Sequence, residues 1–224
     1  MQSRRFFWEA GFLGLVLPSL GCLPAGTFTS ARPIPRGTFE HVASVEGTGA
    51  VYDDGRSLVG GVPSYGLRYG ATERVEIGAR FSPLSLEANV KIGLVRNEWF
   101  ALALAPRVTS TSGIALLTLT QSFPATYARV PVLATLQITE WSTLTPRAGV
   151  GFVAGRAWAW ELGRSGYDLH DPVVEVGGTL LFRLAPTVSL GLDGYAISTI
   201  LDSQVLTGGG GVAVLFTPRQ ETQR

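Results

Sequence analysis

The chain has 224 residues, of which 46% are hydrophobic and 16% are charged, and its formal net charge is +1. This length fits a single domain, and the near-neutral charge excludes binding of nucleic acid through bulk electrostatics. Charged residues are scarce beside the roughly 25% of ordinary soluble domains. With two histidines and one cysteine there is little scope for a metal site, and we expect no cofactor.

Residues 1–22 have the pattern of an export signal. Arg4 and Arg5 precede a mostly apolar run, and Ser19-Leu20-Gly21-Cys22 then resembles the lipobox that precedes a lipid-modified cysteine. We therefore predict that Cys22 is lipidated. An ordinary cleaved signal that ends near Ala25 is the alternative.

Three segments follow this signal. Residues 23–37 are rich in proline and glycine, which predicts an extended linker. Residues 38–217 contain the alternating patterns described below and form the predicted barrel domain. Residues 218–224 are expected to be a polar tail.

The clearest structural signal lies in residues 73–94. Apolar side chains alternate with polar or small ones on both sides of Ser82-Pro83, at Val75, Ile77, Ala79 and Phe81 and then at Leu84, Leu86, Ala88, Val90, Ile92 and Leu94. A period of two indicates β-strands with two different faces. Runs this long match the roughly 9–11 residues that a tilted strand needs to cross a bilayer. The sequence therefore predicts a transmembrane β-barrel.

The same pattern along the chain predicts an all-β fold, an antiparallel up-and-down barrel of about ten strands, with eight or twelve as alternatives. The expected strands are the two within 73–94 and those at about 38–49, 62–71, 98–109, 125–138, 143–154, 172–184, 187–198 and 208–217. Tight connections near 72–73, 96–97, 139–142 and 185–187 alternate with longer ones at 50–61, 110–123, 155–171 and 199–207, with Ser82-Pro83 as the exception. Short turns on one side and long loops on the other are typical of bacterial outer-membrane barrels. An even strand number puts both termini on the short-turn, periplasmic side.

Aromatic residues gather at the predicted strand ends. On the short-turn side we expect Phe39, Tyr69, Phe100, Phe182 and Phe216, with Trp99 and Trp141 in or beside the turns. A second group, at Tyr65, Phe81, Phe152 and Trp158, lies toward the other end. Two such bands are expected where a barrel meets the two membrane–water interfaces.

The strand–turn–strand segment Tyr65–Arg80 and the terminal strand that ends in Phe216 resemble those of small bacterial outer-membrane β-barrel proteins. The resemblance covers residues 38–217. It implies a multi-pass protein of the cell outer membrane, in contact with outer-membrane lipids and inserted by the barrel-assembly machinery. Because this class includes pores, adhesins, enzymes and structural proteins, the resemblance implies no particular activity.

Charged side chains fall on the inward face of the predicted strands. The expected lumen network comprises Arg68, Glu76, Arg80, Glu87, Lys91, Arg107, Arg129, Arg147, Glu175, Arg183 and Asp193, with Glu40 and Glu46 on the same face of the first strand. Ten strands is just above the eight whose interior side chains can fill. We therefore expect ion pairs to fill a narrow lumen, and an open polar pore is the alternative.

These observations favour a structural or narrow-channel role, and we do not expect an enzyme. One alternative is a membrane-embedded hydrolase of lipid or lipopolysaccharide, with Ser165, Asp168, His170 and Asp171 as an acid/base cluster in a loop. Another is a soluble exported barrel with inverted faces, in which Val75, Ile77 and Leu86 line a cavity for an apolar ligand.

Overall fold

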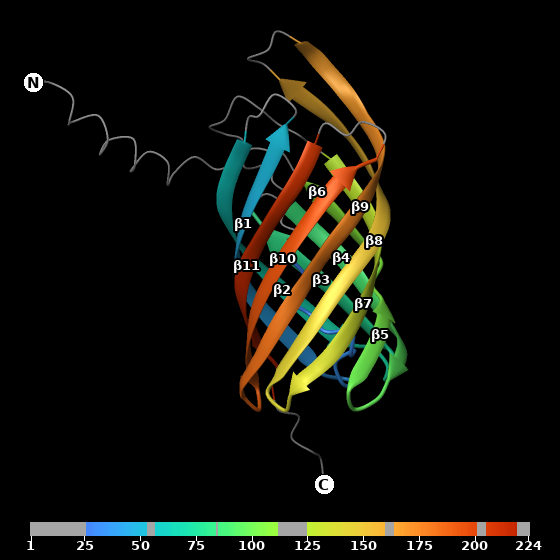
Figure 1. Cartoon of the computed structure of the whole chain (residues 1–224), viewed down its shortest axis with the longest axis vertical. Coiled ribbons are helices and arrows are strands. Elements are labelled where there is room, and N and C mark those ends of the chain that lie inside the picture. The colour runs from blue at the N-terminus through green and yellow to red at the C-terminus, as the bar shows by residue number, and fades with distance from the viewer. Residues whose placement is uncertain are drawn as a thin grey trace, which may run out of the picture.

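The alternating sequence folds into a closed antiparallel β-barrel of ten strands in the computed structural model, which describes residues 26–52, 57–83, 85–111, 125–159, 164–200 and 205–218 (Figure 1). The predicted fold class is therefore confirmed. In these ranges no helix is long and apolar enough to cross a membrane.

Each strand pairs with its neighbours in sequence, and the first pairs with the last. The strands are β1 (Phe39–Tyr52), β2 (Ser57–Gly70), β3 (Val75–Ser82), β4 (Ser85–Arg96), β5 (Phe100–Leu104), β6 (Arg107–Thr111), β7 (Ala125–Thr139), β8 (Ser142–Ala159), β9 (Arg164–Ala185), β10 (Val188–Thr199) and β11 (Val205–Phe216). Segments β5 and β6 together form one barrel strand, because both pair with β4 on one side and β7 on the other. The interruption falls at Ala105-Pro106, where proline has no N–H for the ladder.

The two ends of the barrel differ. At one end, the short-turn end, residues 71–74, 97–99, 140–141 and 186–187 connect the strands. At the other end β8 and β9 run on as a paired hairpin beyond the neighbouring strands (Figure 1). Residues 155–159 and 164–171, predicted to be loop, are therefore strand, because Gly155 pairs with Leu169 and Ala157 with Tyr167. The predicted loop at 112–124 lies outside the described residues.

The outer surface is apolar between the two ends, as the alternation predicts. Large exposed hydrophobic side chains include Val45, Tyr65, Ile77, Leu86, Val108, Val130, Val150, Val176, Val212 and Val214. Among strand side chains that the structure describes, the exposed charged ones are Arg96 and Arg183, both within three residues of a short turn. Ile77 and Leu86 are exposed on the outer surface and Val75 is partly exposed, whereas the charged side chains are buried inside, which contradicts the inverted-face alternative.

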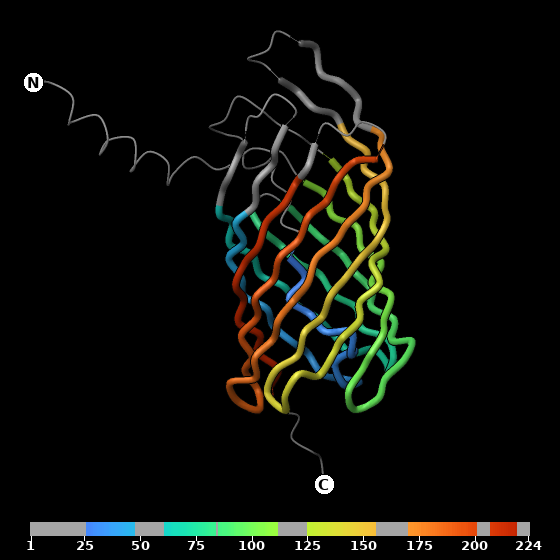
Figure 2. The backbone as a smooth tube through the Cα atoms, in the orientation of Figure 1, coloured from blue at the N-terminus to red at the C-terminus, as the bar shows by residue number. Residues whose placement is uncertain are grey.

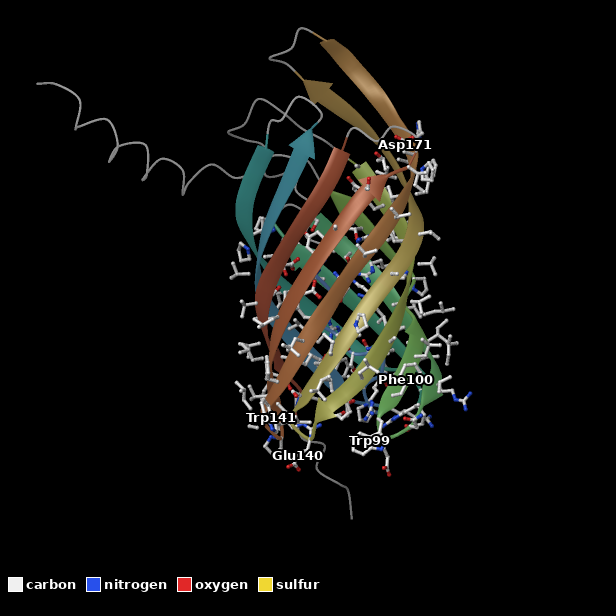
Figure 3. All side chains as sticks on the ribbon, in the orientation of Figure 1. Trp99, Phe100, Glu140, Trp141 and Asp171 are labelled. Carbon is white, nitrogen blue, oxygen red and sulfur yellow. The ribbon has the colours of Figure 1, made fainter. Side chains whose placement is uncertain are left out.

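Aromatic side chains collect at the short-turn end. Trp99, Phe100 and Trp141 lie at this end, and Glu140 is next to Trp141 (Figure 3). Phe39 contacts Tyr69 with ring centroids 4.8 Å apart, and Trp141 stacks on Phe182 at 5.8 Å. This is the band expected on the short-turn side.

The described chain begins inside the barrel. Residues 26–37, expected to be a linker, run within the lower half of the lumen from mid-barrel to the short-turn end, as the first blue stretch in Figure 2 shows. Gly26 lies against Glu46 in the middle of β1, and Gly37 donates to the Gly70 carbonyl oxygen at 2.7 Å. We call residues 26–35 the plug. The sequence analysis predicted a linker here without placing it inside the barrel.

Candidate functional site: the plugged lumen

One chain of ion pairs crosses the middle of the lumen. Arg80 of β3 contacts Glu46 of β1 at 2.8 Å and Glu87 of β4 at 3.1 Å. Arg129 of β7 lies 3.7 Å from Glu87 and 3.1 Å from Glu175 of β9. These strands stand on different sides of the barrel, so the pairs span the interior.

The series of ion pairs continues through the other half of the wall. Arg147 of β8 contacts Glu175 at 2.8 Å and Asp193 of β10 at 2.7 Å. Arg107 of β6 lies 3.9 Å from Glu175. We call these eight residues the central network: Glu46, Arg80, Glu87, Arg107, Arg129, Arg147, Glu175 and Asp193. Its four acids and four arginines balance in charge.

A second group of ion pairs lies nearer the short-turn end. Arg68 is 2.7 Å from Glu40 and 3.9 Å from Glu76, and Lys91 is 2.6 Å from Glu76. This lower network, Glu40, Arg68, Glu76 and Lys91, also balances. Both networks are largely buried, so they face the interior and the plug rather than the outer surface.

The plug begins among the charges of the central network. The Gly26 N–H donates to Glu46 Oε2 at 3.0 Å, and its carbonyl oxygen accepts from Arg80. Arg147 Nη1 donates to Thr27 Oγ1 at 3.1 Å, and that hydroxyl lies 3.4 Å from Asp193 Oδ2. Backbone and hydroxyl groups of the plug thus make hydrogen bonds to charged side chains of the wall, in place of water.

Further toward the short-turn end, wall and plug remain bonded. Lys91 Nζ donates to Thr29 Oγ1 at 2.9 Å and to the Ser30 carbonyl at 3.1 Å. The Ile34 N–H donates to Glu76 Oε2 at 3.1 Å. Arg32 donates to the carbonyl oxygen of Asn97, in a short turn, at 3.0 Å. The plug is therefore attached along its length.

Phe28 is the apolar anchor of the plug. Its side chain is 1% exposed and packs with Val42, Ala213 and Leu215, and Leu181 lies against the same cluster. Its φ is 42°, in the left-handed region that bulky residues rarely adopt. Such a conformation costs about 1–3 kcal/mol and persists only where the surroundings hold it. Packing in this cluster supplies that constraint.

Inward-facing glycines make room for the central network. A Cβ on Gly151 would lie 2.7 Å from Arg129 Cγ, and one on Gly177 would lie 2.9 Å from Arg147 Cζ. One on Gly211 would lie 2.9 Å from Glu46 Cγ and 2.6 Å from the Val45 carbonyl oxygen. The long charged side chains therefore lie across a neighbouring strand where that strand has a glycine.

A matched pair of glycines tests this packing. Gly211→Ala should destabilise the barrel by about 1–3 kcal/mol, because the new methyl group overlaps backbone and Glu46. Gly47→Ala should change stability by less than about 0.5 kcal/mol, since the nearest atom to its Cβ is 3.8 Å away. Urea unfolding in detergent measures both. Equal effects would show that the lumen can adjust around Gly211.

The structure brings ten of the eleven predicted lumen residues into these two networks. The exception is Arg183, which is exposed near the β9–β10 turn and has no carboxylate within ion-pair distance among the described residues. It stands too close to the barrel end to reach the buried acids. Cys22 lies outside the described residues.

The sequence reasoning missed the plug itself. The prolines and glycines of residues 23–37 predicted only an extended linker, but Thr27-Phe28-Thr29 carries a short polar–apolar alternation that suits a buried segment with two faces. That short alternation was the available signal.

The proposed acid/base cluster does not assemble from its described side chains. His170 and Asp171 are successive residues of β9 and point to opposite faces, with His170 exposed against Phe152 and Asp171 buried. The side chains of Ser165 and Asp168 lie outside the described ones. No group of three potential metal ligands occurs among the described residues.

No family model matches the sequence, and no curated protein matches it. Similar solved structures are bacterial outer-membrane barrels. An outer-membrane channel from Pseudomonas putida F1 has a TM-score of 0.54 at 8% identity, covering 84% of this chain and 98% of that chain. The outer-membrane protease OmpT from Escherichia coli has a TM-score of 0.49 at 8% identity, and the match covers 86% of this chain and 100% of that chain. Neisserial surface protein A has a TM-score of 0.43 at 10% identity, and the match covers 80% of this chain and 96% of that chain.

The fold and the site together define the class. The chain is a closed antiparallel β-barrel with an apolar outer surface and a charged interior, and the Pseudomonas putida channel shares that fold. At this identity the likeness concerns the fold alone.

Proposed function

We propose that this chain is a bacterial outer-membrane barrel with a structural or narrow-channel role, closed by its own plug. The observation that carries this is the apolar outer surface, where exposed charges on described strand side chains occur only near the short turns. Water would favour charges at such positions, whereas lipid excludes them. The short-turn end would face the periplasm, and the outer surface would contact outer-membrane lipids after insertion by the barrel-assembly machinery.

The interior supports a closed rather than an open state. Six acidic and six basic side chains pair within the two networks, and the plug occupies space between them. A barrel of ten strands has little room beyond that filled by side chains. A barrel of similar fold, from Pseudomonas putida, is an outer-membrane channel, which keeps a narrow-channel role beside the structural one.

A substitution on the outer surface tests the membrane assignment. Val150 is 64% exposed and stands between Val130 and Val174 of the neighbouring strands. Val150→Arg should weaken folding into lipid vesicles by about 2–4 kcal/mol if this row lies near the bilayer midplane. Val150→Leu is the control and should fold like the parent.

The readout is the fraction of protein that migrates faster on electrophoresis without boiling, measured across a urea series. If Val150→Arg and Val150→Leu were equally stable, the outer surface would face water, and the membrane assignment would fail.

We also propose that Cys22 carries a lipid, because it follows Ser19-Leu20-Gly21 at the end of the export signal. Cys22→Ala should abolish incorporation of labelled fatty acid in a bacterial host and leave unprocessed precursor. Unlabelled, normally processed parent protein would contradict lipidation and leave the barrel assignment intact.

A further inference from the structure

A small cavity remains between the plug and the part of the wall that runs from β1 to β6. Its volume is about 40 Å³, and its lining includes Asn89, Lys91 and Arg107 from the wall and Thr29 from the plug. A single water needs roughly 10–15 Å³ by this measure. The space therefore holds a few water-sized atoms, or one larger ion with a water.

Arg107 reaches this cavity without its hydrogen bonds satisfied. The side chain is 4% exposed, and its Nε and Nη1 have no partner among the described residues. The carboxylate that pairs with it, Glu175, is 3.9 Å from Nη2. A buried charged donor without an acceptor is strongly unfavourable, so such a group calls for an ion or water that is not part of the chain.

None of the described neighbouring groups accepts a hydrogen bond from Nε or Nη1 of Arg107. Glu175 already accepts from Arg129 at 3.1 Å and from Arg147 at 2.8 Å. Glu87 also lines the cavity, but its Oε2 accepts from Arg80 and Thr109. On this side of the lumen the carboxylates are thus shared among several arginines.

Lys91, another cation beside the cavity, has all its N–H groups occupied. Lys91 Nζ contacts Glu76, Thr29 Oγ1 and the Ser30 carbonyl, which accounts for its three N–H groups. Asn89 is the direct cross-strand neighbour of Arg107, and its side chain lines the same space. Arg107 and the Asn89 amide are therefore the donors best placed for a ligand.

We propose that this cavity binds a small monovalent anion of halide size, held by Arg107 and the Asn89 amide. Arg107 is the arginine of the central network whose charge is least compensated, because its nearest carboxylate, Glu175, is 3.9 Å away, whereas each of the other three has one within 3.1 Å. Water would satisfy the N–H groups of Arg107, whereas an anion would also compensate its charge. The volume excludes organic anions as large as gluconate.

The test is thermal unfolding of the full-length protein in detergent, with sodium chloride or bromide replacing sodium gluconate at constant ionic strength. The midpoint should rise with halide concentration and saturate. Arg107→Gln should weaken the apparent halide affinity by about tenfold or more. Arg183→Gln, which removes an exposed arginine at the barrel end, should keep the parent response.

A second measurement covers the case in which Arg107→Gln does not fold. Crystals of the parent protein grown in bromide should show an anomalous peak at hydrogen-bonding distance from the Arg107 guanidinium. Water alone in the cavity, or equal midpoints in halide and gluconate for the parent, would overturn the anion site.

Discussion

Deletion of residues 26–35 should turn a closed barrel into a conducting one. In planar bilayers we expect little or no steady current from the parent, because the plug occupies the lumen and bonds to both charge networks. Without it, Arg80, Lys91 and Arg147 lose acceptors that only water can replace. A hydrated bore lined by charge should then carry a stable current.

A matched pair of phenylalanines separates loss of the plug from general damage. Phe28 anchors the plug at 1% exposure, whereas Phe39 is 47% exposed on the outer surface. Truncating a buried phenylalanine costs about 3–5 kcal/mol, so Phe28→Ala should loosen the plug and give intermittent openings. Phe39→Ala should not raise the current.

Labelling reports the same event without a bilayer. In a Cys22→Ala background, a cysteine introduced by Ala31→Cys should react slowly with a maleimide, since Ala31 is 1% exposed. Adding Phe28→Ala should accelerate labelling. If the deletion variant conducted no more than the parent, the wall side chains alone would close the lumen.

The strands and their faces were predictable because the pattern is locally encoded. A period of two assigns each residue to lipid or lumen, so inward placement of Glu76, Arg80, Glu87 and Lys91 follows from the alternation alone. Strand ends were less accurate. The β8–β9 hairpin extends beyond the predicted boundary, since backbone pairing from Gly155 onward does not require a continuing apolar face.

The plug was not predictable on the same basis. Its position depends on contacts with residues far along the chain, such as Thr27 with Asp193 and Ala31 with Thr135. Its own composition, with prolines at 33 and 35, also suits an exposed spacer. Likewise, the partner of each lumen arginine depends on the register of neighbouring strands, which places Arg147 and Arg129 beside the same carboxylate, Glu175.

That shared carboxylate gives the largest expected effect of a single charge. Glu175 is 1% exposed and lies within ion-pair distance of Arg107, Arg129 and Arg147. Glu175→Gln preserves the side-chain volume but leaves the arginines short of a negative charge. Removing one partner of a buried ion pair costs about 3–5 kcal/mol, so we expect a loss of that size in urea unfolding at pH 7.

Glu140→Gln is the matched control, because Glu140 is exposed in the β7–β8 turn (Figure 3). It should change stability by less than about 0.5 kcal/mol. The loss from Glu175→Gln should also persist in high salt, since buried charges are screened far less than exposed ones. A Glu175→Gln barrel as stable as Glu140→Gln would mean that water enters the lumen and hydrates the arginines, which would contradict a closed, ion-paired interior.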